Sequence, residues 1–281
     1  MLAVALATFV IGHSVQGRPI EATRVGDPAA PVHVLVVGDV HGNEPAGEAI
    51  VARLRRARLS GAAFWLVRTA NPDGRAHDTR QNARGVDLNR NFPYRWAHAA
   101  RGTYYPGPRP ASEPETRALM KLVRRVRPQL AIYYHQHMGI TVRSRAGDVS
   151  VEREYARRTG LPLRSLPNYH GTAVSWEDRE VPGSTAFVVE LRAGPANAAR
   201  HGRAVLALAR QLSRPGGSPP LRSLAQGLAR FASVPRRDDR PGPARGDGVE
   251  RVRAPHLAHR RPADREGARG GAAAGRAARR P

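Results

Sequence analysis

Residues 31–48 read PVHVLVVGDVHGNEPAGE and decide the fold. The run of valines and leucine at residues 32–37 is typical of a short buried strand. His41 and Glu44 follow directly beyond this strand, and Pro45 opens a predicted helix. Ligands of open α/β sheets bind at the carboxyl ends of strands. A histidine and a glutamate three residues apart at that place can both turn toward one metal ion.

The rest of the chain alternates short apolar runs with amphipathic segments. Strands are predicted at residues 63–67, 129–137 and 185–191, and helices at residues 45–58, 112–126, 151–159 and 195–212. Ser112 is the expected N-cap of its helix, with Glu115 completing a capping box. This alternation predicts an α/β fold in a single domain, with a mostly parallel mixed sheet and helices on both faces.

Two segments are expected to be irregular. Residues 68–74 read as a turn-rich loop, and residues 75–109 form a long polar segment with hardly any periodicity. A structureless stretch of this length inside a compact domain is typical of a segment that builds a site.

The two ends of the chain differ from the rest. Residues 1–11 are either a leader or the first strand, and the lack of a basic start favours a strand over residues 8–13. With a leader the protein would be secreted or lie in the cell envelope, and without one it would be cytoplasmic. The tail, residues 213–281, is rich in Arg, Pro, Gly and Ala and is predicted to be disordered, because it holds few apolar residues to bury. No segment approaches the ~20 apolar residues of a membrane span.

The composition restricts the chemistry. The 281 residues include no cysteine, which excludes disulfides, thiolate metal sites and a cysteine nucleophile. The formal net charge of +23 is typical of nucleic-acid-binding proteins. However, residues 211–281 hold 16 Arg and 6 acidic residues, a net +10, with a single aromatic residue, too few for stacking platforms. Nucleic-acid binding through the tail is therefore a minor alternative.

Two further predicted strands carry polar residues. Alternation along residues 129–137 places His135 and His137 on one side of that strand. Glu190 lies near the carboxyl end of the otherwise apolar strand 185–191. Burying an acidic residue is costly unless it is paired or functional, so Glu190 is a candidate site residue.

Six motifs follow one another along the chain. They are HGNE (41–44), NPDG (71–74), TR (79–80), GVDLNRNF (85–92), His135 and Glu190. In order and rough spacing they resemble the zinc carboxypeptidase (carboxypeptidase A) family. The closer resemblance is to its bacterial murein peptide amidase branch, which ASEPET (111–116) supports. The resemblance covers residues 12–212 and implies that these residues form a zinc peptidase-like catalytic domain.

The resemblance implies a metal centre with one Zn²⁺ per chain. His41, Glu44 and His135 are its implied ligands, with a fourth position left for water, as is typical of catalytic zinc. His137 is the alternative third ligand, and the family's ligand at the end of this strand favours His135. Asp87 is the implied acceptor for the second ring proton of a ligand histidine.

Other residues receive substrate roles from the same resemblance. Glu190 is the implied general base, and Arg80 is implied to stabilise the oxyanion together with zinc. Asn89 and Arg90 resemble the pair that binds the terminal carboxylate of the substrate. Tyr169 would correspond to the family's mobile substrate-side tyrosine. The alternative for both arginines is a solvated basic loop.

The expected activity is hydrolysis of an amide bond adjacent to a free carboxylate. The expected partner is a peptide with a free C-terminal carboxylate, and the resemblance points to murein (cell-wall) peptides, with release of a diamino-acid end residue. A general metallocarboxypeptidase and an N-acyl amino acid deacylase are alternatives within the class. A catalytically dead zinc module is an alternative outside it, although such a module would lack Glu190. Side-chain specificity and oligomeric state are not predicted.

Overall fold

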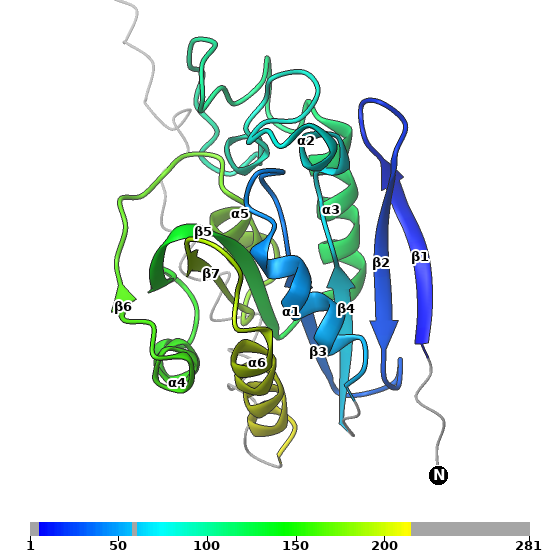
Figure 1. The fold of residues 1–281 in the computed structure, drawn as a ribbon, viewed down its shortest axis with the longest axis vertical. Coiled ribbons are helices and arrows are strands. Elements are labelled where there is room, and N and C mark those ends of the chain that lie inside the picture. Colours follow the sequence, from blue (N-terminus) through cyan, green and yellow to red (C-terminus); the bar gives the residue numbers. More distant parts are fainter. Residues whose placement is uncertain (1–5, 58–60, 215–281) are drawn as a thin grey trace, which may run out of the picture. The chain divides into compact units, whose positions relative to one another are not determined.

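The computed structural model describes residues 6–57 and 61–214. This part of the chain contains a seven-stranded sheet in the order β1-β2-β4-β3-β5-β6, with β7 paired to β5 (Figure 1). The strands are β1 (Leu6–His13), β2 (Pro19–Val25), β3 (Val32–Val37), β4 (Ala62–Val67), β5 (Leu130–Val142), β6 (Leu163–Arg164) and β7 (Thr185–Arg192). β3 lies between β4 and β5 and is parallel to both, whereas β1 and β2 are antiparallel additions. The predicted mixed, mostly parallel sheet is confirmed.

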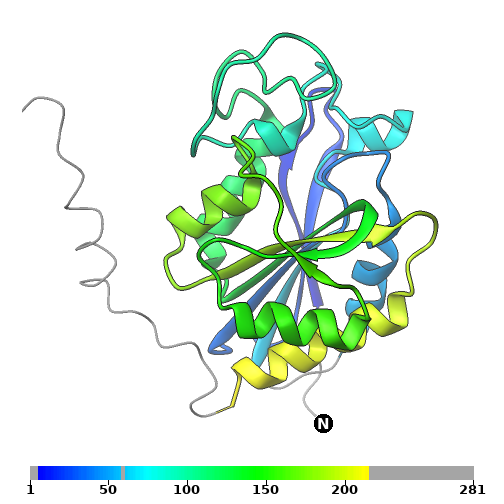
Figure 2. The ribbon, with the colours of Figure 1, turned by 90° about the vertical axis from the view of Figure 1, so that its left-hand side faces the viewer.

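Helices cover both faces of this sheet, as predicted. They are α1 (Ala46–Leu54), α2 (Pro72–His77), α3 (Pro114–Val126), α4 (Val149–Thr159), α5 (Ala173–Glu180) and α6 (Ala198–Leu212), with a 3₁₀ turn, η1 (Leu88–Arg90). One core lies under α1, α4 and α6, and the other lies under α3 and α5. Figure 2 shows α4 and α6 side by side on one face. Within the described residues, no helix is long and apolar enough to cross a membrane.

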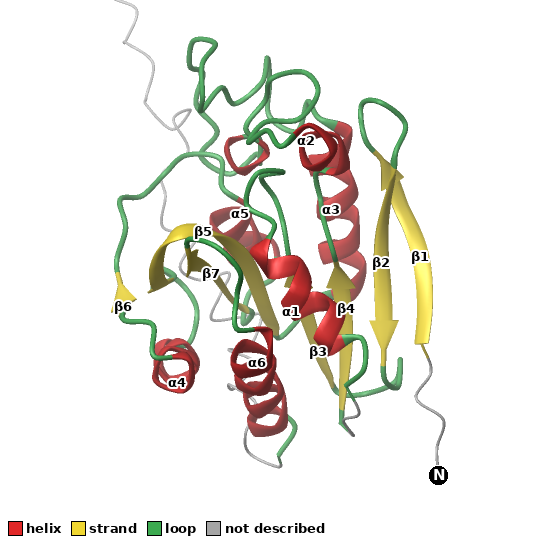
Figure 3. Ribbon diagram, in the orientation of Figure 1, coloured by secondary structure: helices red, strands yellow, loops and turns green. Residues whose placement is uncertain are grey.

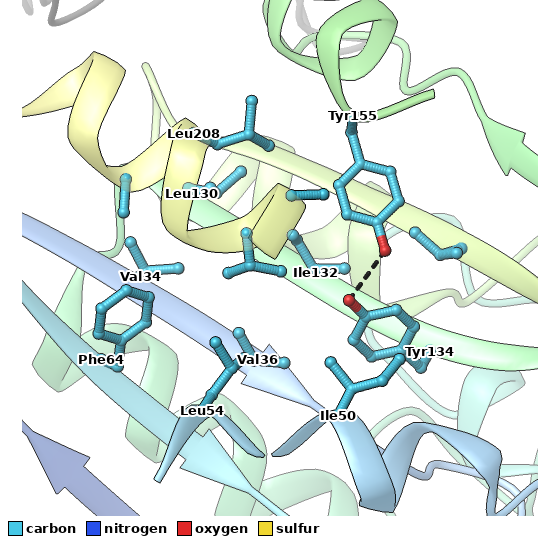
Figure 4. Close-up of a cluster of buried hydrophobic side chains, with 14 of the residues drawn as sticks. Val34, Val36, Ile50, Leu54, Phe64, Leu130, Ile132, Tyr134, Tyr155 and Leu208 are labelled. Carbon is cyan, nitrogen blue, oxygen red and sulfur yellow. Dashed lines mark hydrogen bonds between the residues drawn. The ribbon is translucent and has the colours of Figure 1, made fainter. Parts of the chain in front are cut away.

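The alternation of β3 assigns its side chains to the two cores. Val34 and Val36 lie in the first core, and Leu35 and Val37 lie in the second. Since side chains of successive strand residues point to opposite faces, a continuous apolar run suits a strand covered on both sides. Figure 4 shows the first core, where the Tyr134 and Tyr155 hydroxyl groups are 2.9 Å apart.

The loops gather at one end of the sheet (Figure 3). The loop after β3 carries HGNE to this end, and the segment between α2 and α3 folds over the same place. Apart from η1, residues 78–113 contain neither helix nor strand. The predicted irregular segment therefore lies where the carboxyl ends of the central parallel strands meet.

The prediction of a loop over residues 68–74 is wrong in part, because α2 begins at Pro72. Asn71 is its N-cap, and the side-chain oxygen of Asn71 accepts a hydrogen bond from the Gly74 N–H at 2.9 Å. Proline at the first helical position and an asparagine cap are both typical helix-start signals. Because α2 has only six residues, the same asparagine and proline are equally typical of a turn, which explains the predicted loop.

The predicted capping box at the start of α3 is also wrong. The helix begins at Pro114, and its N-cap residue is Glu113, which makes no side-chain cap bond. The Ser112 hydroxyl donates to Glu113 Oε1 at 2.6 Å instead. Glu115 accepts hydrogen bonds from the Val15 N–H at 2.9 Å and from Asn82 at 3.1 Å. These donors are distant in the sequence, whereas a capping box would use the backbone N–H of the N-cap residue.

Other differences concern boundaries and short elements. β5 extends five residues beyond the predicted end at His137, and helix α5 was not predicted. Thr172 is the N-cap of α5 and accepts from the Ser175 N–H at 3.3 Å. Residues 6–13 form β1, which pairs with β2. The predictions for residues 1–5 and for the tail beyond residue 214 lie outside the described part of the chain.

Candidate metal centre and active site

Three predicted ligand residues converge at the end of the central strands. The Nδ1 atoms of His41 and His135 are 3.0 Å apart. Glu44 Oε1 lies 3.0 Å from His41 Nδ1, and Glu44 Oε2 lies 2.9 Å from His135 Nδ1. All three side chains are buried. Because β3 and β5 are parallel, with Val37 opposite Tyr133, the loop after β3 meets the end of β5 at this point.

The donor set suits a zinc ion. Two imidazole nitrogens and a carboxylate face one another within 4.8 Å, which leaves a fourth position for a non-protein ligand. Burial alone would raise the pKa of Glu44, but hydrogen bonds from His135 and His41 hold that pKa below its usual range. Glu44 is therefore an anion, as a metal ligand has to be.

His137, the alternative third ligand, is not part of this cluster. Its side chain is exposed, although it contributes to the wall of the adjoining cavity. His137 and Met138 both lie opposite Arg192, so the pairing with β7 is irregular here. The regular pairing of β5 with β7 thus ends at His137, at the rim of the sheet.

Asp87 lies directly behind His41. Its Oδ1 is 3.1 Å from the second ring nitrogen of His41, Nε2. Asp87 is fully buried and accepts hydrogen bonds from Arg80 Nε at 3.0 Å and from the Asn89 N–H at 2.9 Å. Burial alone would raise its pKa, but the neighbouring His41 and Arg80 hold it well below the usual range. Asp87 thus remains charged and restrains the His41 ring.

The loop that carries His41 and Glu44, here called the ligand loop, approaches α2 closely. The two glycines of HGNE and NPDG make this approach possible. A Cβ atom at Gly42 would overlap with the Gly74 carbonyl group and the Arg75 nitrogen, and one at Gly74 would overlap with the Asn71 side chain. These neighbours are mostly backbone atoms, which cannot move aside without shifting the loop. Both glycines are therefore required by packing, which brings the loop at Gly42 against Gly74 and Arg75 of α2.

Arg80 bridges two carboxylates of the site. Its guanidinium donates to Glu44 Oε1 at 2.9 Å as well as to Asp87. The Asn71 side-chain amide donates to the Arg80 carbonyl oxygen at 3.3 Å. The cap of α2 thus contacts the backbone of the residue that bridges the site.

Arg90 and Asn89 occupy the next position along the cavity. The Arg90 guanidinium lies 4.7 Å from the ring centroid of Tyr169 and 5.5 Å from that of Tyr104. The Asn89 Nδ2 atom is 3.4 Å from His135 Nε2, and Asn89 Oδ1 accepts from the Ala173 N–H at 2.9 Å. Asn89 therefore joins the histidine to the first turn of α5.

Sequence reasoning missed Tyr104 at this position. It lies in the irregular segment 75–109, and its ring also contacts the Arg80 guanidinium, 5.2 Å from the ring centroid. Nothing in its local sequence marks it, because the segment has no periodicity that would assign a face to a side chain.

Glu190 lies on β7 directly opposite His135 in the β5–β7 pairing. It is half-buried, and no described residue hydrogen-bonds its carboxylate. It borders a cavity of about 660 Å³. Eight of the nine predicted site residues line this cavity: His41, Glu44, Arg80, Asn89, Arg90, His135, Tyr169 and Glu190. The ninth, Asp87, lies behind His41.

Comparisons with known proteins identify the family. Residues 5–146 match the family model described as zinc carboxypeptidase. Murein peptide amidase A of Escherichia coli (strain K12) is 32% identical over 158 residues, covering 50% of this chain and 64% of that protein. A metallocarboxypeptidase A-like protein of Trichophyton verrucosum (strain HKI 0517) is 28% identical over 237 residues, covering 64% of this chain and 56% of that protein. The chain thus spans less than two thirds of the length of these relatives.

Solved structures share the fold. The crystal structure of murein-tripeptide amidase from Escherichia coli O157 has a TM-score of 0.57 at 24% identity, covering 76% of this chain and 94% of that one. Bovine thrombin-activatable fibrinolysis inhibitor has a TM-score of 0.62 at 18% identity, covering 73% and 88%. At these identities the likeness establishes the fold alone. Because the family match spans half of the sequence and the fold agrees, the chain belongs to the zinc carboxypeptidase family.

Proposed function

We propose that this protein is a zinc-dependent hydrolase that cleaves an amide bond adjacent to a free carboxylate in murein peptides. The observation that carries the proposal is the convergence of His41, Glu44 and His135, from two separate elements, beside the unpaired Glu190. A zinc-binding module without catalysis would have no use for an acidic residue at that place. The family match supports a hydrolase and not the nucleic-acid-binding alternative.

His41, Glu44 and His135 would hold one Zn²⁺ per chain. The bound ion supplies Lewis acidity and lowers the pKa of a bound water toward ~7. With its proton on Nε2, His41 donates to Asp87 and presents the Nδ1 lone pair to the cluster. Asp87 thereby fixes both the tautomer and the orientation of this ring.

Glu190 would act as the general base. Its carboxylate takes a proton from the attacking water and passes it to the nitrogen of the leaving amine. Its place on β7 opposite His135 and its position in the cavity wall support this role. Within the described residues, its carboxylate forms no ion pair or hydrogen bond that would have to break first.

The arginines would bind the charged parts of the substrate. Arg90, whose guanidinium contacts the rings of Tyr169 and Tyr104, is placed to pair with the free carboxylate, with Asn89 beside it. Arg80 would donate to the oxyanion that develops on the carbonyl oxygen. To do so, the Arg80 guanidinium would have to release its hydrogen bond to Glu44. Glu44 would then be free to hold the metal.

Murein peptides that end in a diamino acid are the favoured substrates. The 32% identity to murein peptide amidase A supports this choice over a general metallocarboxypeptidase or an N-acyl amino acid deacylase. A panel of a murein tripeptide, ordinary peptides and N-acyl amino acids separates the three activities by kcat/KM. The proposal fails if the zinc-loaded protein hydrolyses none of them.

The role of Glu190 is tested by the Glu190→Gln variant. We expect kcat to fall by about 10²–10⁴-fold, while zinc content measured by elemental analysis stays near one per chain. Glu21→Gln, an exposed carboxylate on β2, is the matched control and should keep full activity. Undiminished turnover in Glu190→Gln would refute its assignment as the base.

A further inference from the structure

Tyr104 belongs to the cavity wall, and the proposed mechanism gives it no role of its own. The residue is 61% exposed, so burial of apolar area contributes little to its position. Its ring contacts two guanidinium groups, that of Arg80 at 5.2 Å and that of Arg90 at 5.5 Å from the ring centroid. These are the two arginines to which the proposed mechanism assigns the oxyanion and the terminal carboxylate.

The backbone beside Tyr104 is fixed, although its segment is neither helix nor strand. The Tyr105 N–H donates to the Gly102 carbonyl oxygen at 3.0 Å, and the Tyr105 carbonyl oxygen accepts from the Asp87 N–H at 2.8 Å. The side-chain amide of Gln81 also donates to the Gly102 carbonyl oxygen, at 2.6 Å. Gln81 and Asp87 lie in the same segment as the two arginines. Main-chain hydrogen bonds therefore hold the exposed ring beside them.

Arg80 has strong partners besides this ring. Its Nε and Nη2 atoms donate to Asp87 Oδ2 at 3.0 and 2.9 Å, and its Nη1 atom donates to Glu44 at 2.9 Å. Asp87 is fully buried, so its ion pair with Arg80 is only weakly screened by solvent. Loss of the Tyr104 ring would therefore leave Arg80 in place, even after Glu44 has been released.

Arg90 depends on aromatic rings instead. Within the described residues its guanidinium forms no ion pair, and its one hydrogen bond runs to the Asn89 carbonyl oxygen at 2.8 Å. Its remaining contacts are the rings of Tyr104 and Tyr169. An aromatic ring attracts a guanidinium group electrostatically. Removing one of the two rings should therefore loosen Arg90 far more than Arg80.

We propose that Tyr104 is a positioning residue whose ring keeps Arg90 beside Arg80, at the spacing that a terminal residue requires. In a terminal residue, only the nitrogen and the α-carbon separate the scissile carbonyl group from the carboxylate. The two guanidinium groups must therefore act side by side, although like charges repel. A ring that attracts both offsets this repulsion. The inference rests on the proposed function, because that function assigns the substrate's charges to these arginines.

Steady-state kinetics with a murein tripeptide test the role of the ring. Tyr104→Leu removes the ring and keeps an apolar side chain, so KM should rise by about 3- to 10-fold with kcat nearly unchanged. This split is expected because Arg90 already binds the carboxylate in the ground state, whereas Arg80 stays bonded to Asp87. Tyr104→Phe retains the ring and should keep the native KM. An unchanged KM in Tyr104→Leu, or an equal rise in Tyr104→Phe, overturns the proposal.

The control is Tyr94→Leu, which removes a comparable contact elsewhere. The Tyr94 ring centroid lies 5.5 Å from the Arg179 guanidinium, and Tyr94 is not among the described residues that line the cavity. This variant should keep the native KM, and thermal unfolding verifies that all three variants fold. A rise in KM equal to that of Tyr104→Leu would show that general packing is the cause, and would overturn the proposal.

Nuclear magnetic resonance separates this inference from the proposed function, because it requires no turnover. The Nε–H signals of Arg80 and Arg90 in the zinc-loaded protein are assigned by their loss in Arg80→Lys and Arg90→Lys. The Arg90 order parameter should exceed ~0.6 in the native protein and in Tyr104→Phe, and fall below that value in Tyr104→Leu. The Arg80 order parameter should stay high in all three proteins.

The outcomes of the two experiments are distinct. If the zinc-loaded native protein hydrolyses no peptide of the panel, the proposed function fails, and the order parameters still decide the role of Tyr104. An Arg90 side chain that is already mobile in the native protein, or that stays equally rigid in Tyr104→Leu, overturns that role.

Discussion

Asp87 shows how one residue can connect the metal ligands to the substrate side of the site. It contacts the His41 ring, the Arg80 guanidinium and the backbone of Asn89 at once. A carboxylate in this position raises the basicity of the histidine and restricts its rotation. The charge of Asp87 is therefore more important than its shape.

The Asp87→Asn variant tests this point. It keeps the shape and removes the charge, so we expect zinc affinity to fall by about 10–100-fold. Competition with a chromophoric chelator measures the change. Glu21→Gln removes an exposed carboxylate and should leave the affinity unaltered. Wild-type affinity in Asp87→Asn would show that the contact does not tune the metal site.

At the scale of elements, the short helix α2 links fold stability to the position of Arg80. Its N-cap, Asn71, is fully buried and uses both ends of its amide, one for the Gly74 N–H and the other for the Arg80 carbonyl oxygen. An N-cap side chain ordinarily affects only the stability of its helix. Here the same side chain also restrains a residue that borders the cavity.

Two cap variants separate these effects. Asn71→Ala and Asn197→Ala, at the N-cap of α6, should each lower the free energy of unfolding by about 1–2 kcal/mol. Only Asn71→Ala should also reduce kcat, because it alone releases the Arg80 backbone. Urea unfolding and steady-state kinetics provide the two readouts. An equal effect of both variants on kcat would contradict the link.

At the scale of the whole molecule, buried acids make stability depend on pH. Glu177 is fully buried, and burial raises its pKa to about 7 from the ordinary value of 4.5. Between these two values the folded protein keeps a proton that the unfolded chain releases. The Glu177 contribution to stability therefore falls as the pH rises through this window.

The Glu177→Gln variant should remove this dependence. We expect it to be about 1–3 kcal/mol more stable than the native protein at pH 8 and to differ little at pH 4.5, since its amide oxygen can still accept from Tyr133. Urea unfolding of the zinc-free protein at the two pH values measures the difference. A gain of equal size at both values would show that packing, not ionisation, is the cause.

The sequence predicted the elements whose causes are local. The apolar run of β3 alternates between two cores, so its pattern alone indicates a strand covered on both faces. Likewise, His41 and Glu44 are three residues apart, and their shared direction needs only the short loop that carries them. Helix caps were less predictable, because the donors that Glu115 uses come from Val15 and Asn82, far away in the chain.

The parallel sheet, the ligand loop and the type of donor follow from local patterns in the chain, since periodicity and short spacing express local hydrogen bonding. That His135 and not His137 joins the cluster depends on tertiary structure, because the other two ligands come from the loop after β3, which meets β5 at His135. The same holds for Tyr104, which reaches the cavity through packing between segments that no local pattern connects. Contacts between distant segments, unlike periodicity, produce no recognisable pattern in any short stretch of the sequence.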